Sequence, residues 1–387
     1  MKFFENTEIA FRSKSDYELK RAYLLFKSVN YNFLVNFGAV SLPIFKNIPG
    51  VKTLIKNTIF DHFCGGENLQ ESIKTVDRLY EQNVGSILDY SIEGKEDERS
   101  YNACFNEIMS IIDLAENNPK IPFVVFKPTG YGNIDLYEKV GKKQQLSPAE
   151  HTAWEHIRTR FYKTCEKAYE KGVRIMIDAE ETWMQDAADD LAQEMMKTFN
   201  KERVVVLNTL QMYRTDRLEY LKNEFKKAEE EDYYLGFKIV RGAYMEKERE
   251  RAQKMGYPSP IQPDKAATDA SYNAAIDFIT EHHERIFLFA GTHNEESCMN
   301  LKNKIDQNSD LANCWFGQLL GMSDNISFVL GENGYHVAKY VPFGPVKEVI
   351  PYLIRRAQEN TSVAGQSNRE LTLIEKELKR RKELKQA

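Results

Sequence analysis

The sequence predicts an α/β fold, a (β/α)8 barrel with an N-terminal helical arm, and three observations support this fold class. From Val84 onward, eight short apolar or β-branched runs alternate with longer amphipathic segments. Most of these runs are apolar on both faces, which is typical of buried parallel strands. Polar and charged residues gather where the runs end, as they do at the carboxyl ends of barrel strands. An open doubly wound sheet is the alternative, and it is disfavoured because no Gly-x-Gly-x-x-Gly follows a run.

Eight units of strand followed by helix indicate a closed barrel, which we place at residues 84–365. The predicted strands are Gly85–Ser91, Phe123–Lys127, Arg174–Asp178, Arg203–Leu207, Phe237–Val240, Ile286–Ala290, Cys314–Leu319 and His336–Val341. Amphipathic segments expected to form helices separate most of them, for example Pro148–Lys171, Thr182–Thr198, Asp216–Glu230 and Thr268–His282. The proline-rich segment Tyr257–Pro263 is expected to cross the barrel mouth after the fifth strand.

The segments on either side of the barrel are expected to be helical. Residues 1–83 form the predicted arm, with apolar-rich helices at Tyr17–Phe37 and Ile55–Phe63 and an amphipathic helix at Leu69–Gln82. Residues 366–387 form a charged C-terminal helix. A solvated tail is the preferred interpretation of this helix, and a membrane-surface segment is the alternative.

A helix after the eighth strand carries two arginines around which the predicted site is organised. Its apolar residues recur at three- and four-residue intervals, which predicts one buried face: Val346, Val349, Ile350, Leu353, Ile354 and Ala357. Arg355 and Arg356 are adjacent, and Glu359 lies one turn on, where it can pair with either of them. Two guanidinium groups beside an apolar face suit a small carboxylate or phosphate. For this stretch taken alone, an ordinary solvated helix surface is the alternative.

Composition narrows the classes of function. The net charge of -5 and the lack of a basic domain argue against nucleic-acid binding. The five scattered cysteines contain no Cys-x-x-Cys pair, which suits a reducing compartment and argues against a zinc site. The N-terminus lacks the apolar core of a signal peptide, and no run of about 18 apolar residues predicts a membrane-spanning helix.

Charged side chains from different strand ends are expected to converge on one barrel mouth. Their cationic excess predicts an anionic ligand, either phosphates, a carboxylate or both. These residues are Lys127, Asp178, Arg241, His293, Arg355 and Arg356. Gly242 and Ala243 permit close approach of the backbone to a ligand, and Tyr244 and Tyr340 are placed to wall a small pocket. No second histidine lies at ligand spacing from His293, so we expect no metal centre.

Seven short motifs, in order along residues 85–360, resemble the proline dehydrogenase family. They are KPTG, DAEET, KIVRGAYMEKE, ATDASY, GTHN, GQLLGM and YLIRRAQEN. The forms of KPTG, VRGAY and QLLGM are more similar to the single-function enzymes than to the bifunctional bacterial fusion. The resemblance implies a flavoenzyme that oxidises L-proline on a (β/α)8 barrel, with FAD bound noncovalently at the C-terminal mouth.

The resemblance also implies roles for individual residues. Arg355 and Arg356 would hold the proline carboxylate with help from Lys127. The proline pocket would be lined by Asp178, Tyr244, Leu319 and Tyr340. FAD would contact Gln211, Lys238, Arg241, Gly242, Ala243, Tyr244, Thr268, Thr292, His293 and Glu359. The residues expected to act most directly in the reaction are Asp178, Lys238, Arg241, Tyr244 and Tyr340. Asp89 and Glu93 match an acidic pair after the first strand, where Glu93 would gate Arg355 by ion pairing.

The implied reaction is the first step of proline catabolism. Hydride transfer from L-proline to flavin N5 would give 1-pyrroline-5-carboxylate, and a quinone would accept the electrons. Quinone use implies peripheral membrane association, so the expected location is the cytoplasm or the inner face of a respiratory membrane. Three alternatives stay open: a hydroxyproline dehydrogenase, which Tyr340 disfavours, a Schiff-base lyase with Lys127 as nucleophile, and a noncatalytic ligand-binding barrel.

Overall fold

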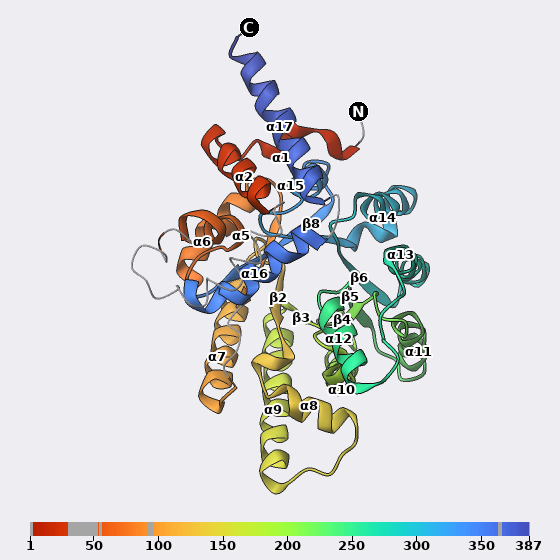
Figure 1. The fold of residues 1–387 in the computed structure, drawn as a ribbon. Coiled ribbons are helices and arrows are strands. Elements are labelled where there is room, and N and C mark those ends of the chain that lie inside the picture. Colours follow the sequence, from red (N-terminus) through yellow and green to blue (C-terminus); the bar gives the residue numbers. More distant parts are fainter. Residues whose placement is uncertain (1–2, 30–52, 54–55, 91–95, 363–365, 387) are drawn as a thin grey trace. The chain divides into compact units, whose positions relative to one another are not determined.

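Eight parallel strands form one sheet in a nearly closed barrel, which confirms the predicted (β/α)8 fold class (Figure 1). The order of the strands in the sheet is β1-β8-β7-β6-β5-β4-β3-β2. This computed structural model describes residues 3–29, 53, 56–90, 96–362 and 366–386, without the side chains of residues 28, 29, 355–362, 366 and 367.

The strands are short and mostly buried along their length. Their bounds are β1 Gly85–Tyr90, β2 Phe123–Phe126, β3 Arg174–Ile177, β4 Val206–Gln211, β5 Leu235–Val240, β6 Ile286–Gly291, β7 Trp315–Leu319 and β8 His336–Phe343. Phe123 of β2 packs edge to face on Phe289 of β6 and Trp315 of β7, at ring-centroid distances of 5.3 and 4.9 Å. Because β2 is not a neighbour of β6 or β7 in the sheet, these rings fill the barrel interior.

Strand β4 lies further along the chain than the sequence predicts. The prediction was Arg203–Leu207, whereas β4 spans Val206–Gln211. The second half of the strand is polar, yet Asn208, Thr209 and Gln211 are all buried. Their side chains bond to groups inside the protein, so the strand needs no apolar residues there. The prediction was wrong because it followed the apolar run alone.

Helices connect the strands, and their ends carry recognisable caps. The helices from the first strand onward are α7 Glu98–Ala115, η3 Pro128–Gly130, α8 Ile134–Gly141, α9 Pro148–Lys171, α10 Thr182–Phe199, α11 Arg217–Glu230, α12 Met245–Met255, α13 Lys265–Glu281, α14 Glu295–Gln307, η4 Ser309–Asn313, α15 Asp324–Glu332, α16 Val346–Ser362 and α17 Gln366–Leu384. Before β1 lie η1 Phe3–Glu5, α1 Thr7–Phe11, α2 Asp16–Val29, η2 Lys56–Phe60, α5 Asp61–Phe63 and α6 Leu69–Tyr80. Helix α9 matches its prediction at both ends, because Ser147 forms a capping box with Glu150 and Gly172 ends the helix with φ of 68°.

The chain divides into two compact units, which we describe separately. Residues 95–317 form the middle unit, and residues 1–94 together with 318–387 form the terminal unit. The middle unit contains β2 to β6 and the start of β7, and the terminal unit contains β1 and β8. The domain boundaries expected from the sequence, after residues 83 and 365, stay predictions.

The apolar face predicted for α16 is buried within the terminal unit. It forms one cluster with side chains from earlier segments of the chain: Val346, Val349, Ile350, Leu353, Phe60, Phe63 and Met322. Ile354 packs against this cluster, while the side chain of Ala357 lies outside the described residues. Burial of this face therefore fixes the helix that carries the arginine pair.

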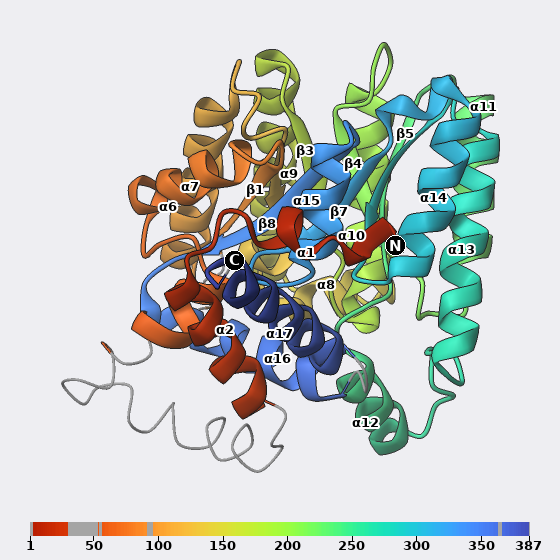
Figure 2. The same cartoon turned by 90° about the horizontal axis from the view of Figure 1, so that it is seen from above.

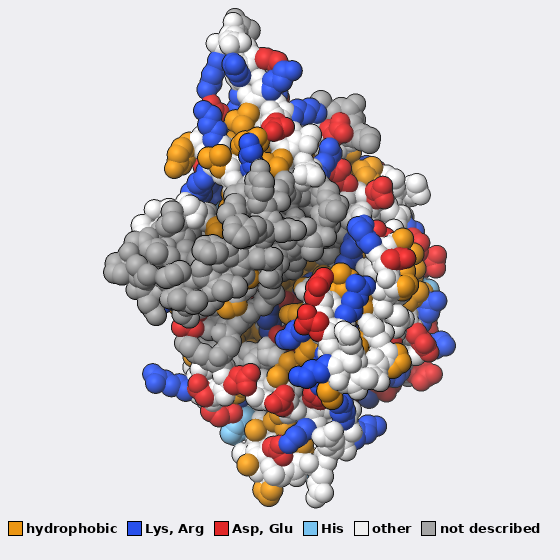
Figure 3. Space-filling model, in the orientation of Figure 1, with side chains coloured by type: hydrophobic (Ala, Val, Ile, Leu, Met, Phe, Trp, Pro, Cys, Tyr) orange, Lys and Arg blue, Asp and Glu red, His pale blue; other side chains and the backbone are white. Residues whose placement is uncertain are grey.

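Helix α17 is charged, as predicted, but it is not a solvated tail. Leu373 and Ile374 are each 1% exposed and pack with Phe11, Leu19 and Phe26. Helix α17 lies beside α2, while Lys and Arg side chains gather along its outer face (Figures 2 and 3). The tail interpretation was wrong because the apolar stripe of α17 is narrow and hidden among charged residues. Across the described parts of the chain, no helix is both long enough and apolar enough to cross a bilayer.

Candidate functional site

Lys238 and Asp178 form an ion pair at the carboxyl ends of β5 and β3. Lys238 is in register with Thr209 of β4, and Asp178 follows β3, where its N–H donates to the carbonyl of Phe126 at 3.0 Å. The two side chains are only 5% and 14% exposed. Opposite charges buried together compensate each other's lost hydration, so the pair fixes an ammonium group beside a carboxylate at the barrel mouth.

Arg241, the first residue after β5, is held by hydrogen bonds from all three of its nitrogens. Nε donates to Oδ1 of Asp269 at 2.6 Å, Nη1 to Oγ1 of Thr292 at 2.6 Å, and Nη2 to Oγ of Ser297 at 3.0 Å. The guanidinium also lies 4.5 Å from the ring centroid of Tyr272. A positive charge held in this way is preorganised for an anionic group at the mouth.

The two threonines expected to contact a cofactor have different surroundings. Thr292 follows β6, where its N–H donates to the carbonyl of Gly317 at 2.9 Å and its hydroxyl accepts from the N–H of Asn294 at 3.1 Å. Thr268 is 8% exposed and its hydroxyl donates to the carbonyl of Asp264 at 3.1 Å, within the first turn of α13. Thr292 is thus placed beside Arg241, whereas Thr268 bonds to its own helix.

Gly242 is required by the close approach of an aromatic ring. Its φ is +131°, and an added Cβ would lie 2.5 Å from the ring of Tyr213. The N–H of Tyr213 donates to the carbonyl of Arg241 at 2.7 Å, which holds this ring against the turn after β5. Close approach of a ligand to Gly242 and Ala243 stays a prediction.

Helix α12 begins directly after Tyr244 and is anchored by polar groups. The carboxylate of Glu248 is fully buried and accepts the N–H and the hydroxyl of Thr182 at 2.7 and 2.6 Å. Arg251 donates to Glu138 at 2.6 Å, which connects α12 to α8. No apolar pattern marks α12 in the sequence, because only two of its residues are buried and most of its residues are charged.

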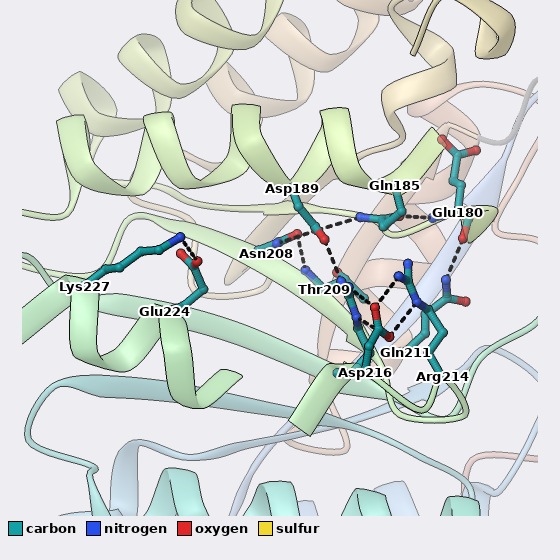
Figure 4. A network of polar contacts seen from close by, with 11 residues as sticks. Glu180, Gln185, Asp189, Asn208, Thr209, Gln211, Arg214, Asp216, Glu224 and Lys227 are labelled. Carbon is teal, nitrogen blue, oxygen red and sulfur yellow. Dashed lines mark hydrogen bonds and ion pairs between the residues drawn. The ribbon is translucent and has the colours of Figure 1, made fainter. Parts of the chain in front are cut away.

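Glu180 joins the ends of β2, β3 and β4 to α10, and Figure 4 shows its bonds to Gln185 and Gln211. Its carboxylate accepts the N–H of Thr129 at 2.9 Å and the Thr129 hydroxyl at 2.6 Å. Its own N–H donates to Oε1 of Gln185 at 2.9 Å, and its carbonyl accepts from Nε2 of Gln211 at 2.6 Å. Nε2 of Gln185 in turn donates to Oδ1 of Asp189 at 2.8 Å. Glu180 is therefore held through its side chain and through its backbone.

The same network reaches the start of α11. Asp189 accepts from Nδ2 of Asn208 at 3.0 Å and from Nη1 of Arg217 at 2.5 Å. Arg217 and Arg214 both donate to Asp216, at 2.6 and 2.5 Å. These charged hydrogen bonds tie the ends of β3 and β4 to two helices and so restrict the position of the site residues on these strands.

Glu180 is also a carboxyl group with a raised pKa at the barrel mouth of the middle unit. Burial, and after it the charge of the neighbouring Glu181, together raise its pKa to about 7, against the hydrogen bonds from Thr129 and the charge of Lys127. Glu181 in turn is paired with Lys247 of α12. Carboxyl groups that titrate near neutral pH are enriched at functional sites, although no sequence pattern marks Glu180 as such a group.

The terminal unit places Tyr340 and Leu319 on neighbouring strands. The N–H of Leu320 donates to the carbonyl of Tyr340 at 2.9 Å, and Tyr340 is 8% exposed. Tyr340 is in register with Ile87 of β1, and Asp89, two residues further along β1, is also buried. The two residues expected to line a substrate pocket within this unit therefore have adjacent backbones.

Four residues of the expected site lie partly or wholly outside the described residues. Arg355, Arg356 and Glu359 belong to α16, but their side chains lie outside the described residues. Glu93 lies outside the described residues altogether. The roles expected for these four residues stay predictions.

Comparison with known proteins identifies the family to which the chain belongs. A family model described as proline dehydrogenase matches residues 72–369. The chain belongs to the proline dehydrogenase family. This confirms the resemblance of the seven motifs, because the matched range includes all of them.

Curated relatives carry several names. The chain is 35% identical to the carbapenem antibiotics biosynthesis protein CarD of Pectobacterium carotovorum, over 82% of this chain and 83% of that protein. It is 32% identical to the mitochondrial proline dehydrogenase 1 of Dictyostelium discoideum, over 97% and 74%. It is 31% identical to the hydroxyproline dehydrogenase of Xenopus laevis, over 96% and 88%.

Solved structures share the fold of this chain at low sequence identity. Proline utilization A (PutA) of Bdellovibrio bacteriovorus, inactivated by N-propargylglycine, matches with a TM-score of 0.73 and 19% identity, over 92% of this chain. The PutA D778Y variant of Bradyrhizobium japonicum matches with a TM-score of 0.69 and 20% identity, over 85% of this chain. The chain spans only 38% and 34% of the length of these two PutA chains.

The structure brings some of the expected family residues together within the middle unit. It pairs Lys238 with Asp178, bonds Arg241 to Thr292, and joins Gln211 to the backbone of Glu180. The other expected residues of this unit follow strand ends: Lys127 after β2, Ala243 and Tyr244 after β5, and His293 after β6. Their contacts with proline and FAD stay predictions.

Two acidic residues of this site were not predicted from the sequence. Asp269 bonds to Arg241 and lies in the ATDASY motif, and Glu180 lies in DAEET. Both motifs had been recognised, so the signal was present, but neither acidic residue was assigned a partner. Which acid meets which base depends on the fold and not on the spacing along the chain.

Proposed function

We propose that this protein is a FAD-dependent proline dehydrogenase that converts L-proline to 1-pyrroline-5-carboxylate. The family match over residues 72–369 carries the proposal, and the charged groups at the barrel mouth support it. In this reaction a hydride leaves C5 of proline and a proton leaves its nitrogen, so that the C5–N bond becomes double.

Arg355 and Arg356 are proposed to hold the substrate carboxylate, with Lys127 as a third cation. Guanidinium groups bind carboxylates through paired hydrogen bonds, which fix the orientation of the substrate as well as its position. The buried face of α16 supports this role, because it gives the two arginines a rigid base. Tyr340 is proposed to pack on the ring of the bound substrate.

The donor set at the ends of β4, β5 and β6 fits a flavin. Arg241 and Lys238 are cations held in fixed positions, and they suit a group that gains negative charge when it accepts a hydride. The residues proposed to hold FAD are Gln211, Lys238, Arg241, Gly242, Ala243, Tyr244, Thr268, Thr292, His293 and Glu359. When bound, FAD would supply the hydride acceptor, its N5 atom.

Asp178 and Glu93 are proposed to act through neighbouring cations. Asp178 accepts a hydrogen bond from Lys238 and so keeps this ammonium group in one orientation at the mouth. Glu93, with Asp89, is proposed to gate Arg355 by ion pairing. Both roles use the negative charge of the carboxylate, so Asp178→Asn and Glu93→Gln should weaken them while retaining similar size.

The second candidate is hydroxyproline dehydrogenase, the name carried by the relative from Xenopus laevis. Tyr340 argues against it, because a 4-hydroxyl packed against the tyrosine ring would lose water without a certain replacement. An unpaired polar group of this kind costs about 1–3 kcal/mol. We therefore expect the protein to prefer L-proline over trans-4-hydroxy-L-proline.

The test is anaerobic mixing of the FAD-loaded protein with L-proline. The visible absorbance of the flavin should bleach, and more slowly with trans-4-hydroxy-L-proline. Flavin that stays oxidised with both compounds would refute the proposal. Borohydride trapping of a substrate on Lys127 would instead support a Schiff-base lyase.

We further propose that the electrons pass to a quinone and that the protein associates peripherally with a membrane. This part rests on the family resemblance, which also suggests the cytoplasm or the inner face of a respiratory membrane. Proline-dependent reduction of a short-chain quinone and sedimentation with liposomes are the measurements. If proline bleaches the flavin but no quinone is then reduced, the proposed acceptor is wrong, whereas the proposed oxidation of proline still stands.

A further inference from the structure

Lys339 of β8 is a fully buried cation whose hydrogen-bonding capacity is used completely. Its Nζ donates to the carbonyl of Met322 at 2.6 Å and to the carbonyl of Leu319 at 3.2 Å, and it lies 2.9 Å from Oδ1 of Asp324. An ammonium group has three donors, so each donor has one partner. An apolar residue would fill a strand position at lower cost than a buried charge, which suggests that the bonds themselves are needed.

The partners of Lys339 all lie on the segment of residues 319–324, which connects β7 to α15. The same segment is held by its backbone, since the N–H of Leu320 donates to the carbonyl of Tyr340 at 2.9 Å. On another side, Nε2 of His62 lies 2.9 Å from the carbonyl of Gly321. Lys339 therefore binds the segment that carries Leu319 to the strand that carries Tyr340.

Helix α17 reaches the same segment through Glu370. Oε1 of Glu370 accepts the N–H of Ser323 at 2.5 Å, and Glu370 is 6% exposed. Oδ2 of Asp324 pairs with Lys14 at 2.8 Å. Basic and acidic residues thus alternate in this cluster, which consists of Lys14, Asp324, Lys339 and Glu370. Burial, and after it the charge of Asp324, together raise the pKa of Glu370 to about 7, against the bond from Ser323 and the charges of Lys339 and Lys14.

We propose that Lys339 and Glu370 are positioning residues for the substrate: they fix residues 319–324, so that Leu319 and Tyr340 hold the bound ring. The inference rests on the proposed function, because it takes Leu319 and Tyr340 as pocket residues. It assigns to the C-terminal helix an effect on substrate affinity, although α17 carries none of the expected site residues. Neither positioning residue touches the reacting atoms, so their loss should weaken binding and leave the chemical step almost unchanged.

Steady-state kinetics of four variants test the inference. Lys339→Met should raise KM for L-proline about tenfold, and Glu370→Ala about fivefold, with kcat within about twofold of wild type. Glu370→Gln keeps an oxygen that can accept the N–H of Ser323, so its KM should stay close to the wild-type value. Lys379→Met, at a position on α17 whose side chain is 79% exposed, is the matched control and should change neither constant.

Hydrogen exchange of the peptide that covers residues 319–324 gives a readout independent of turnover. Exchange should be faster in Glu370→Ala than in wild type and unchanged in Glu370→Gln. If Lys339→Met does not fold, the comparison of Glu370→Ala with Glu370→Gln still tests the inference, because these two variants differ in the hydrogen bond from the N–H of Ser323.

The outcomes separate this inference from the proposed function. A wild type that does not oxidise proline refutes the proposed function, whereas faster exchange in Glu370→Ala would still show that α17 holds the segment. A wild type that oxidises proline, together with wild-type KM in both Lys339→Met and Glu370→Ala, overturns the positioning role. A fall in kcat without a rise in KM would also overturn it, because it would place these residues in the chemical step.

Discussion

Glu180 should make the stability of the middle unit depend on pH, and replacing it by glutamine tests this. Burial raises the pKa of Glu180 from 4.5 to about 7 in the folded protein. Between these values the folded protein holds a proton that the unfolded chain has released, so the free energy of unfolding falls as pH rises. From about pH 5.5 to about pH 8, this linkage removes about 2 kcal/mol. Glutamine does not ionise, so Glu180→Gln should lack this part of the pH dependence.

The three tryptophans of the chain allow the free energy of unfolding of the middle unit to be measured. Trp154, Trp183 and Trp315 all lie in the middle unit, so urea unfolding followed by tryptophan fluorescence reports on it. At the upper pH, Glu180→Gln should be at least as stable as wild type, because it keeps an acceptor for the N–H of Thr129 without a buried charge. Glu194→Gln, on the exposed face of α10, is the matched control. Equal changes of stability with pH in wild type and Glu180→Gln would show that the reasoning is wrong.

The remaining predictions concern the site and the packing of the C-terminal helix. Arg356→Met should raise KM for proline, with about 1.5–3 kcal/mol of binding lost, while FAD stays bound; wild-type kinetics would contradict the carboxylate role. Arg241→Ala should bind flavin more weakly or be reduced more slowly by proline, which flavin content and stopped-flow absorbance would show. Tyr340→Ser should narrow the preference for proline over hydroxyproline, and an unchanged ratio of kcat/KM values would argue for a purely structural tyrosine. Leu373→Ala should destabilise the terminal unit by about 3 kcal/mol, since it removes a buried side chain, and chemical denaturation would measure this.

The fold was predictable where local signals agree with the final packing. Ser147 and Gly172 mark the two ends of α9 in the sequence as clearly as in the structure, because caps are local interactions. The predicted position of β4 was wrong because Asn208 and Thr209 are buried polar residues whose hydrogen-bond partners lie in other segments of the chain. Hydrophobic periodicity carries no information about such partners.

The site was predictable as a set of strand-end charges, but not as a set of pairs. Lys238, Asp178 and Arg241 were all expected at the mouth, and the structure adds that the first two neutralise each other. Lys339 was hidden within an apolar strand, and its role depends on backbone carbonyls, which no side-chain pattern reveals. Charge complementarity between distant segments is therefore what the sequence alone leaves open.

The packing of α17 against α1 and α2 has a consequence for synthesis of the chain. Phe11, Leu19 and Phe26 leave the ribosome long before Leu373 and Ile374, which cover them, have been synthesised. Residues 95–317, in contrast, become available as one continuous piece and can collapse while translation proceeds. The apolar surfaces of α1 and α2 therefore stay exposed until α17 has been synthesised. A chaperone that binds nascent chains would be expected to find them during this interval, and a ribosome stalled shortly before codon 373 should hold them in a protease-sensitive state.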